Sequence, residues 1–200
     1  MIHNLGRRFA DISLIQRKPL ILTRCARSVY LRWEKPSGNF VKLNYDGAVK
    51  DNPAKAGIGG IIRDHEGKVL LCFAEPIPFT TSIMAEMLAA KRGVGLACEN
   101  DLSQLWMEGD AKTIVDIITG KRTRNLQLEK HVIDMKCQFA LLENCKCTHI
   151  YREGNRIADK LAKMGLRMKT GQVWHGNPPS QIHKLLQEEA AGVILKRRAR

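Results

Sequence analysis

The chain has 200 residues, of which 44% are hydrophobic, and it carries a formal net charge of +13 at pH 7. This length supports one domain with a substantial core plus flanking segments, and it is short for two full domains. No apolar run approaches the ~18–20 residues that a membrane-spanning helix needs, which excludes membrane insertion.

The positive charge is concentrated at the two ends of the chain. Residues 1–40 carry 8 basic and 2 acidic side chains (+6), residues 41–166 carry 18 and 16 (+2), and residues 167–200 carry 7 and 2 (+5). Basic arms around a near-neutral middle segment suit a protein that meets a polyanion at its edges. Solubility alone would explain basic tails equally well.

Cysteine usage and the N-terminal composition bear on the compartment. The 6 cysteines form no CxxC pair, which favours a reducing, intracellular location such as the nucleus or cytoplasm. His131 and His149 lie too far from a cysteine pair to suggest zinc, so we interpret both as surface or satisfied core histidines. Residues 1–33 are rich in Arg with Asp11 as their acid, which is consistent with an organellar targeting segment or with a linker from a larger polyprotein.

The first folded element follows Pro36-Ser37-Gly38, where the composition indicates a loop. Alternating side chains over residues 40–44 predict a strand with two different faces, and two further strands are predicted beyond it. These strands cover residues 57–62 and 68–73, and turns at 51–54 and 64–67 separate the three. Three strands joined by short turns form an antiparallel meander.

A helix is expected to begin after Thr80-Thr81-Ser82 and to run to about Cys98. The later elements are a strand at 104–107, helices at 111–119 and 125–142, a strand at 148–151 and a helix at 155–164. A passage from strand through helix to strand requires a crossover, so the order implies an α/β fold with a mixed five-stranded sheet and helices on both faces. The expected organisation is a basic extension or linker at 1–39, a folded domain at 40–166 and a basic tail at 167–200.

Four acidic residues stand at the edges of these apolar elements, namely Asp46, Glu86, Asp110 and Asp159. A carboxylate is costly there unless something compensates its charge, and Mg²⁺ prefers carboxylate, phosphate and water oxygens. Ligands of such sheets gather at strand ends, so we expect the four side chains to converge in one cleft that binds divalent metal. The competing interpretation is a capping or surface role, which is credible for Asp110 at the start of a helix.

The acids belong to short motifs that occur in a fixed order. These are KLNYDGA at 42–48, NPA at 52–54, GIGGIIRD at 57–64, AE at 85–86, EGDA at 108–111 and YREGNRIADKLA at 151–162. The stretch from Val41 to Gly165 resembles ribonuclease H type 1 domains, and it is most similar to their plant, retroelement-derived, reverse-transcriptase-like group. A lone Asp-Gly or Ala-Glu pair would mean nothing, whereas the ordered set is specific.

The resemblance implies an enzyme that hydrolyses the RNA strand of RNA–DNA hybrids with two Mg²⁺ ions, for which Mn²⁺ can substitute. By that resemblance Asp46 would bridge both ions, Glu86 and Asp110 would hold one ion, and Asp159 would hold the other. The residues expected to contact the nucleic acid are Asn52, Asn155, Arg152, Lys121, Arg122 and Arg124. We expect the protein to be a monomer with nucleic acid as its partner.

Two departures from the family pattern keep an alternative open. Residues 151–155 pass from strand to helix without the histidine of the familiar flexible loop, and Ser82-Ile83 stand where many relatives carry an Asn pair that reads the minor groove. The alternative is a catalytically weak or silent nucleic-acid-binding domain from a retroelement, or a retroelement fragment without a cellular role. Retention of four repelling carboxylates favours the enzyme, because a domain that only binds has no need for them.

Overall fold

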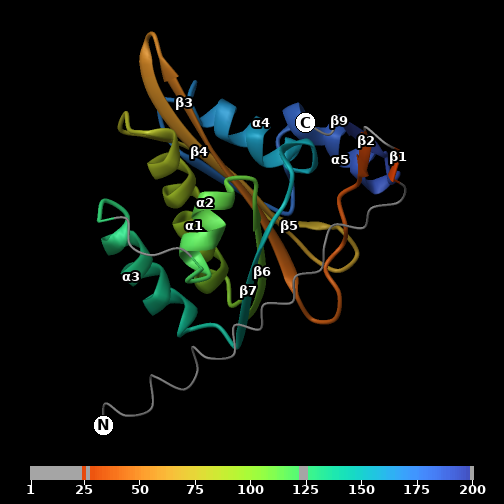
Figure 1. Cartoon of the computed structure of the whole chain (residues 1–200), viewed down its shortest axis with the longest axis horizontal. Helices are drawn as coiled ribbons and strands as arrows, with labels where there is room; N and C mark the ends of the chain where they lie inside the picture. The colour runs from red at the N-terminus through yellow and green to blue at the C-terminus, as the bar shows by residue number, and fades with distance from the viewer. Residues whose placement is uncertain (1–23, 26–27, 122–125, 199–200) are drawn as a thin grey trace.

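The structure, a computed structural model, describes residues 24–25, 28–121 and 126–198, and Figure 1 shows a twisted sheet with helices on both of its faces. Six strands form this sheet in the order β7-β6-β3-β4-β5-β8. Neighbours from β3 through β4 and β5 to β8 are antiparallel, whereas β6 and β7 run parallel to β3. Their bounds are β3 (Val41–Asp51), β4 (Ala54–Arg63), β5 (Val69–Ile77), β6 (Gln104–Gly109), β7 (Asn144–His149) and β8 (Gln172–His175).

Two hydrophobic cores lie on opposite faces of the sheet. On one face α1 packs against β3 and β4 and buries side chains such as Leu43, Tyr45 and Met87. On the other face α4 packs against β4 and β5, with Ile61 and Leu161 in its core. The helices are α1 (Ser82–Glu99), α2 (Lys112–Ile118), α3 (Glu129–Phe139), α4 (Arg156–Gly165) and α5 (His183–Ala190), with short 3₁₀ helices η1 (Arg152–Gly154) and η2 (Ser180–Ile182). In the described part of the chain, none of the helices is long and apolar enough to cross a membrane.

The element order expected from the sequence is confirmed, but several boundaries differ. The third helix is shorter than the expected 125–142, and the strand β7 begins four residues earlier than the expected 148. In β7 the polar residues Lys146 and Thr148 alternate with Cys145 and Cys147, all of them only partly buried. Such an edge strand has a weak hydrophobic signal, which is why the sequence did not reveal its first half.

The sheet has a sixth strand, which corrects the expected count of five. Strand β8 pairs antiparallel with β5 from Leu71↔His175 to Ala74↔Gln172, and it comes from the segment expected to be a basic tail. It covers the outer edge of β5, whose backbone groups would otherwise be unpaired. Beyond it, Ile182 is fully buried in the core beneath α4. Residues 172–190 are therefore part of the folded domain.

The two ends of the described chain meet in a second, small sheet. It contains β1 (Arg24–Cys25), β2 (Ser28–Leu31) and β9 (Leu195–Arg198) in the order β1-β2-β9, with both pairings antiparallel. Leu31 and the following Trp33 are buried, at 4% and 8% exposed. The N-terminal and C-terminal flanks thus pair with each other beside the main sheet, as Figure 1 shows on the right of the view.

A buried polar cluster ties both flanks to the main sheet. Asn44 Oδ1 accepts hydrogen bonds from Trp33 Nε1 and Arg63 Nη2, each at 2.9 Å. The Arg63 guanidinium lies 3.5 Å from the centre of the Trp33 ring and pairs with Glu189 of α5 at 2.6 Å. Because a buried cation is costly without partners, this arrangement holds residue 33 and residue 189 in place around one side chain.

Lys42 is the second buried cation of this cluster. Its Nζ donates to the Glu34 carbonyl oxygen at 2.7 Å and to Glu108 Oε1 at 3.1 Å, and it lies 3.5 Å from the centre of the Trp106 ring. Burial lowers the pKa of Lys42, and the Glu108 carboxylate opposes that shift. The cluster lies on the α4 face of β3 and β6. Its residues Asn44 and Glu108 each stand two positions before an acid, Asp46 and Asp110 respectively.

Candidate active site

Gly47 in β3 allows α1 to approach the sheet closely. A Cβ atom at this position would lie 2.4 Å from the Ala85 carbonyl carbon and 2.4 Å from the Glu86 backbone nitrogen. Only glycine fits against a backbone at that distance. The contact places Glu86, in the first turns of α1, beside Asp46.

Three of the four predicted acids converge. Asp46 comes from the middle of β3, Glu86 from α1 and Asp110 from the residue after β6. Each offers a carboxylate oxygen, and these oxygens all lie within 4.8 Å of one another. Asp46 is the most buried of the three, at 7% exposed. The strand ends and one helix therefore bring together residues that are up to 64 positions apart.

Burial and mutual repulsion favour the protonated forms of two of these acids. Burial, followed by the negative charge of Asp46, raises the pKa of Glu86 to about 11. Burial also raises the pKa of Asp46 to about 7, with the Asp110 and Asp159 charges adding to the shift and a hydrogen bond with Glu86 opposing it. The folded protein thus retains protons that the unfolded chain releases above about pH 4, so these groups should stabilise the metal-free protein more as the pH falls.

Two hydrogen bonds orient the carboxylates. The Gly47 backbone N–H donates to Asp46 Oδ1 at 2.9 Å. Asn155 Nδ2 donates to Asp110 Oδ1 at 3.2 Å and to the Tyr45 carbonyl oxygen at 2.9 Å, so this amide ties Asp110 to β3. The N-cap of α2 is Ala111, and the Asp110 carboxylate accepts from Asn155 instead of capping that helix. The capping role considered for Asp110 is therefore wrong.

Asp159 lies near this group but has cationic partners of its own. Its carboxylate pairs with Lys163 at 2.6 Å and lies 3.6 Å from Arg152 Nη2. Its charge still contributes to the raised pKa of Asp46, so the two carboxylates are within electrostatic reach. A close approach at Gly59 fixes its position, because a Cβ there would lie 2.2 Å from the Ala162 backbone nitrogen of α4.

The residues present fit a divalent cation. Glu86 Oε2 is buried without a hydrogen-bond partner, and an unpaired buried carboxylate oxygen is costly. A cation with oxygen ligands would satisfy that atom and neutralise the repulsion among Asp46, Glu86 and Asp110. The oxygens already lie at separations that a common ion can bridge.

The residues expected to contact nucleic acid differ in their exposure to solvent. Asn52 is exposed at the tip of the β3–β4 hairpin, which projects from the sheet in Figure 1, and it is six residues beyond Asp46. Lys121 is exposed after α2, and Arg152 is 74% exposed beside Asp159. Arg122 and Arg124 lie outside the described residues. Asn155 is only 1% exposed, so the expected contact with nucleic acid is corrected to the internal role of holding Asp110.

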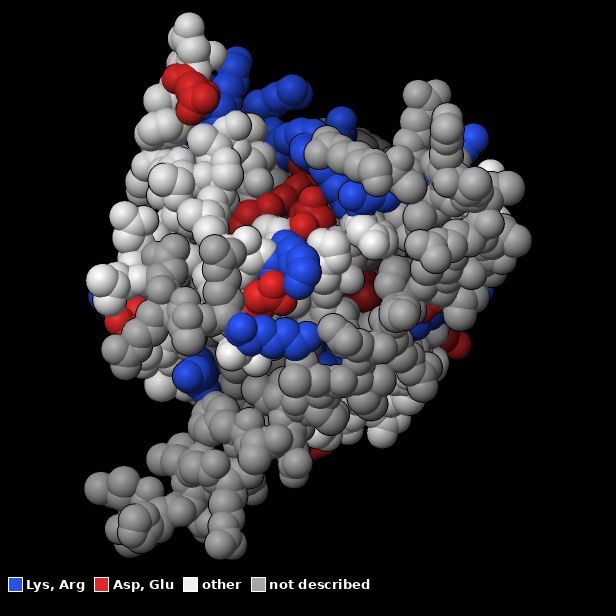
Figure 2. Space-filling model, in the orientation of Figure 1, with Lys and Arg blue, Asp and Glu red and all other residues white. Residues whose placement is uncertain are grey.

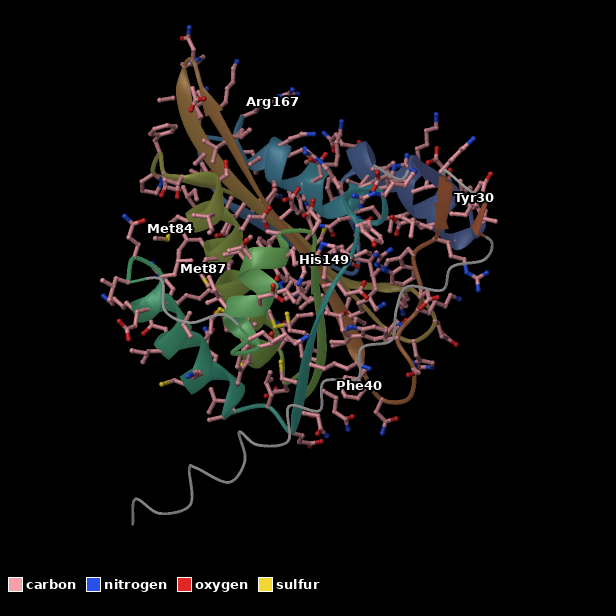
Figure 3. The ribbon with its side chains drawn as sticks, viewed as in Figure 1. Tyr30, Phe40, Met84, Met87, His149 and Arg167 are labelled. Carbon is pink, nitrogen blue, oxygen red and sulfur yellow. The ribbon has the colours of Figure 1, made fainter. Side chains whose placement is uncertain are left out.

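One titratable side chain at the site was missed from the sequence. His149 ends β7, and its Nε2 lies 3.1 Å from the Asp110 carbonyl oxygen, while its ring packs edge-on against Tyr151. Burial lowers the pKa of His149. Figure 3 shows this residue near the middle of the molecule. The loop after β7 has no histidine, as expected, but a histidine does stand beside the acids at the strand end.

The face around the acids is divided by charge. In Figure 2, acidic side chains gather near the centre of this face, and Lys and Arg side chains border them along α4. Two basic side chains, Arg152 and Lys163, pair with Asp159. Acids that can hold a cation therefore lie within a basic border that attracts an anionic polymer.

Comparison with known families matches this region of the chain. A family model described as reverse transcriptase-like matches residues 44–165, which is more than half of the chain and contains all four acids. The chain belongs to the reverse transcriptase-like family.

Two curated proteins that are similar to this chain are named for ribonuclease H. An Arabidopsis thaliana protein that bears the name putative ribonuclease H protein is 29% identical over 170 residues, which are 84% of this chain and 27% of that protein. Ribonuclease HI of Halobacterium salinarum is 24% identical over 130 residues, which are 64% of this chain and 65% of that protein. The chain thus spans about a quarter of the first relative and just under two thirds of the second.

Solved structures show that this reverse transcriptase-like chain has a ribonuclease H-like fold. The ribonuclease H1 of Halobacterium salinarum superimposes with a TM-score of 0.61 at 23% identity, covering 64% of this chain and 98% of that structure. The LC11 ribonuclease H1, solved in complex with an RNA/DNA hybrid, superimposes with a TM-score of 0.59 at 26% identity and covers 64% and 96%. The superimposed part is thus about two thirds of this chain and nearly the whole of each ribonuclease H1 structure.

Proposed function

We propose that this chain is a divalent-metal-dependent endonuclease that hydrolyses the RNA strand of RNA–DNA hybrids. The convergence of Asp46, Glu86 and Asp110 within 4.8 Å, on a ribonuclease H-like fold, is the observation that carries the proposal. A relative of the same fold was solved in complex with an RNA/DNA hybrid, which supports the choice of substrate.

The acids would hold Mg²⁺, or Mn²⁺ in its place, with Asp46 shared between two ions. Glu86 and Asp110 would complete one site, and Asp159 would contribute to the second after giving up its pairs with Lys163 and Arg152. When bound, such a pair of ions supplies the positive charge that stabilises an in-line displacement at phosphorus. The unpartnered Glu86 Oε2 supports this assignment, because a ligand is what that buried oxygen lacks.

The surrounding residues would position the acids and the substrate. Asn155 fixes the orientation of Asp110, and the Gly47 N–H fixes that of Asp46. Arg152 is 74% exposed at the edge of the cluster, so its guanidinium would be free to bind a phosphate once Asp159 binds metal. His149, beside Asp110, would accept or release a proton at the edge of the site.

The proposal is tested with three labelled duplexes of one sequence: an RNA–DNA hybrid, duplex DNA and duplex RNA. Each is incubated with the full chain in Mg²⁺, in Mn²⁺ and in EDTA, and products are separated by length. We expect internal cuts in the RNA strand of the hybrid with either metal and none in EDTA. Cleavage that persists in EDTA, or equal cleavage of duplex DNA, would rule out the proposed activity.

A further inference from the structure

The paired strands β2 and β9 form a ribbon, Ser28–Leu31 with Leu195–Arg198, that is firmly attached to the nuclease-like domain. Leu31 is buried, and the adjacent Trp33 lies under the Arg63 guanidinium at 3.5 Å. On the other strand, the Arg197 guanidinium lies 4.1 Å from the centre of the Tyr151 ring and 3.7 Å from Glu153. Both strands of the β2–β9 ribbon are therefore held against the domain by side chains on their inner face.

The opposite face of the β2–β9 ribbon is aromatic and basic. Tyr30 pairs with Lys196 across the two strands, so their side chains project from the same face. Arg32 also projects outward, because it is exposed between the buried Leu31 and Trp33. Figure 3 shows Tyr30 at the outer edge of the molecule. Both residues are exposed, and the ion pairs found among the described residues include neither Arg32 nor Lys196, so these two charges are open to an external anion.

The ribbon lies beside the element that borders the acid cluster. Strand β9 contacts η1, the short helix that carries Arg152 and leads into α4 with Asp159. Arg152 at the edge of the cleft and Lys196 and Arg32 on the outer face of the ribbon are thus exposed cations on neighbouring elements, whereas Arg197 on the inner face pairs with Glu153. By contrast, residues 41–166, which form most of the domain and include Arg152, carry a net charge of only +2.

We infer that the outer face of the β2–β9 ribbon is a second nucleic-acid contact, which binds the phosphate backbone of the substrate outside the cleft. Arg32 and Lys196 would each neutralise a phosphate, and Tyr30 between them would pack against the sugar or base of the same strand. That the bound polymer is an RNA–DNA hybrid rests on the proposed function, whereas the positive charge of the ribbon's outer face is independent of it. The ribbon would lengthen the footprint of the enzyme on its substrate.

The inference is tested by the salt dependence of binding. The full chain is titrated with RNA–DNA duplexes of about 8 to about 24 base pairs whose RNA strand carries 2′-O-methyl groups, so that cleavage does not interfere. Because each phosphate contact contributes about 0.9 to the slope of log affinity against log salt, the variant with Arg32→Ala and Lys196→Ala should lose about 1.8 from the slope on the longest duplex. On duplexes too short to contact the cleft and the ribbon together, the difference between the two slopes should shrink.

A variant with Lys68→Ala and Lys136→Ala is the matched control, because it likewise removes two exposed positive charges, from the β4–β5 turn and from α3. Its slope should equal that of the wild type. Parallel slopes for wild type and the ribbon variant, or an equal loss in the control, would overturn the inference.

Cleavage of an unmodified hybrid in Mg²⁺ separates this inference from the proposed function. Cleavage together with parallel slopes would refute the ribbon contact alone. A flatter slope in the ribbon variant without any cleavage by the wild type would support the ribbon and refute the nuclease. Tyr30→Phe should bind as the wild type and Tyr30→Ala should bind more weakly, and equal binding by both would remove the tyrosine from the proposed contact.

Discussion

Removing one partner of the ion pair between Arg63 and Glu189 should be among the most destabilising single changes to the chain. The two side chains are 2% and 8% exposed, they are 126 residues apart in sequence, and their charged atoms are separated by 2.6 Å. Glu189→Ala would leave a buried guanidinium with only its hydrogen bond to Asn44 and its contact with the Trp33 ring. Removing one partner of a buried pair costs about 3–5 kcal/mol.

For a chain of this size, each kcal/mol corresponds to about 2–4 °C, so Glu189→Ala should lower the melting temperature by roughly 6–20 °C. The neighbouring Glu188→Ala is the control, because Glu188 pairs with Arg156 at 2.7 Å but both side chains are about a third exposed, at 27% and 31%. A pair of that kind contributes about 0–1 kcal/mol. Thermal and urea unfolding followed by tryptophan fluorescence would compare the two variants.

Replacing both partners tests the cause. If the loss in Glu189→Ala comes from a stranded charge, then Arg63→Met combined with Glu189→Leu should recover part of it, since no buried ion remains. A Glu189→Ala variant that is no less stable than Glu188→Ala would refute the view that the C-terminal segment is locked to the sheet through Arg63. The same view predicts that removing residues 170–200 destabilises the domain, because β8, Ile182 and Glu189 are lost together.

The acid cluster yields the remaining predictions. Glu86→Gln should stabilise the metal-free protein at pH 8 by at least about 1 kcal/mol, because the native state no longer has to hold a proton with a pKa near 11. This gain in the free energy of unfolding should shrink toward pH 5. A gain that grew instead, measured by urea unfolding in EDTA, would contradict the assignment. Asn155→Ala should weaken activation by Mg²⁺ roughly 10–100-fold, since Asp110 loses its orienting hydrogen bond. An unchanged Mg²⁺ midpoint would show that this hydrogen bond is not needed. His149→Ala should reduce cleavage roughly tenfold and alter the pH profile below about pH 6.5, and His149→Gln, which keeps a polar side chain but cannot transfer a proton, should not recover the rate. Identical profiles in all three proteins would exclude a proton-transfer role.

Much of the site could be predicted because its acids stand in recognisable local settings. Asp46 lies within an alternating strand and is followed by the glycine that admits α1, Glu86 lies in the first turns of a helix, and Asp110 follows a buried strand. These settings and the order of the elements can be predicted from the period at which apolar residues recur along the chain. The pair between Asp159 and Lys163 was also within reach, because residues at i and i+4 meet on a helix.

The interactions that were missed all depend on contacts between distant residues. Asn155 contacts Asp110 across 45 positions and Arg63 contacts Glu189 across 126, and no local pattern encodes either separation. His149 was interpreted as an ordinary histidine because its place beside Asp110 depends on how β7 pairs with β6. The C-terminal strand β8 is only four residues long, which is too short for a period of two to be distinguished from a tail.

The most direct test of the central claim is single-turnover cleavage of a labelled RNA–DNA hybrid in Mg²⁺ by the wild type and by Asp46→Asn. The wild type should cut the RNA strand, and the variant should be folded but inactive, because it lacks the carboxylate proposed to be shared by both ions. Its stability without metal should equal or exceed that of the wild type, since one like charge is removed from the cluster. A variant that retains more than about a tenth of the wild-type rate, with the same dependence on Mg²⁺, would contradict the two-ion assignment.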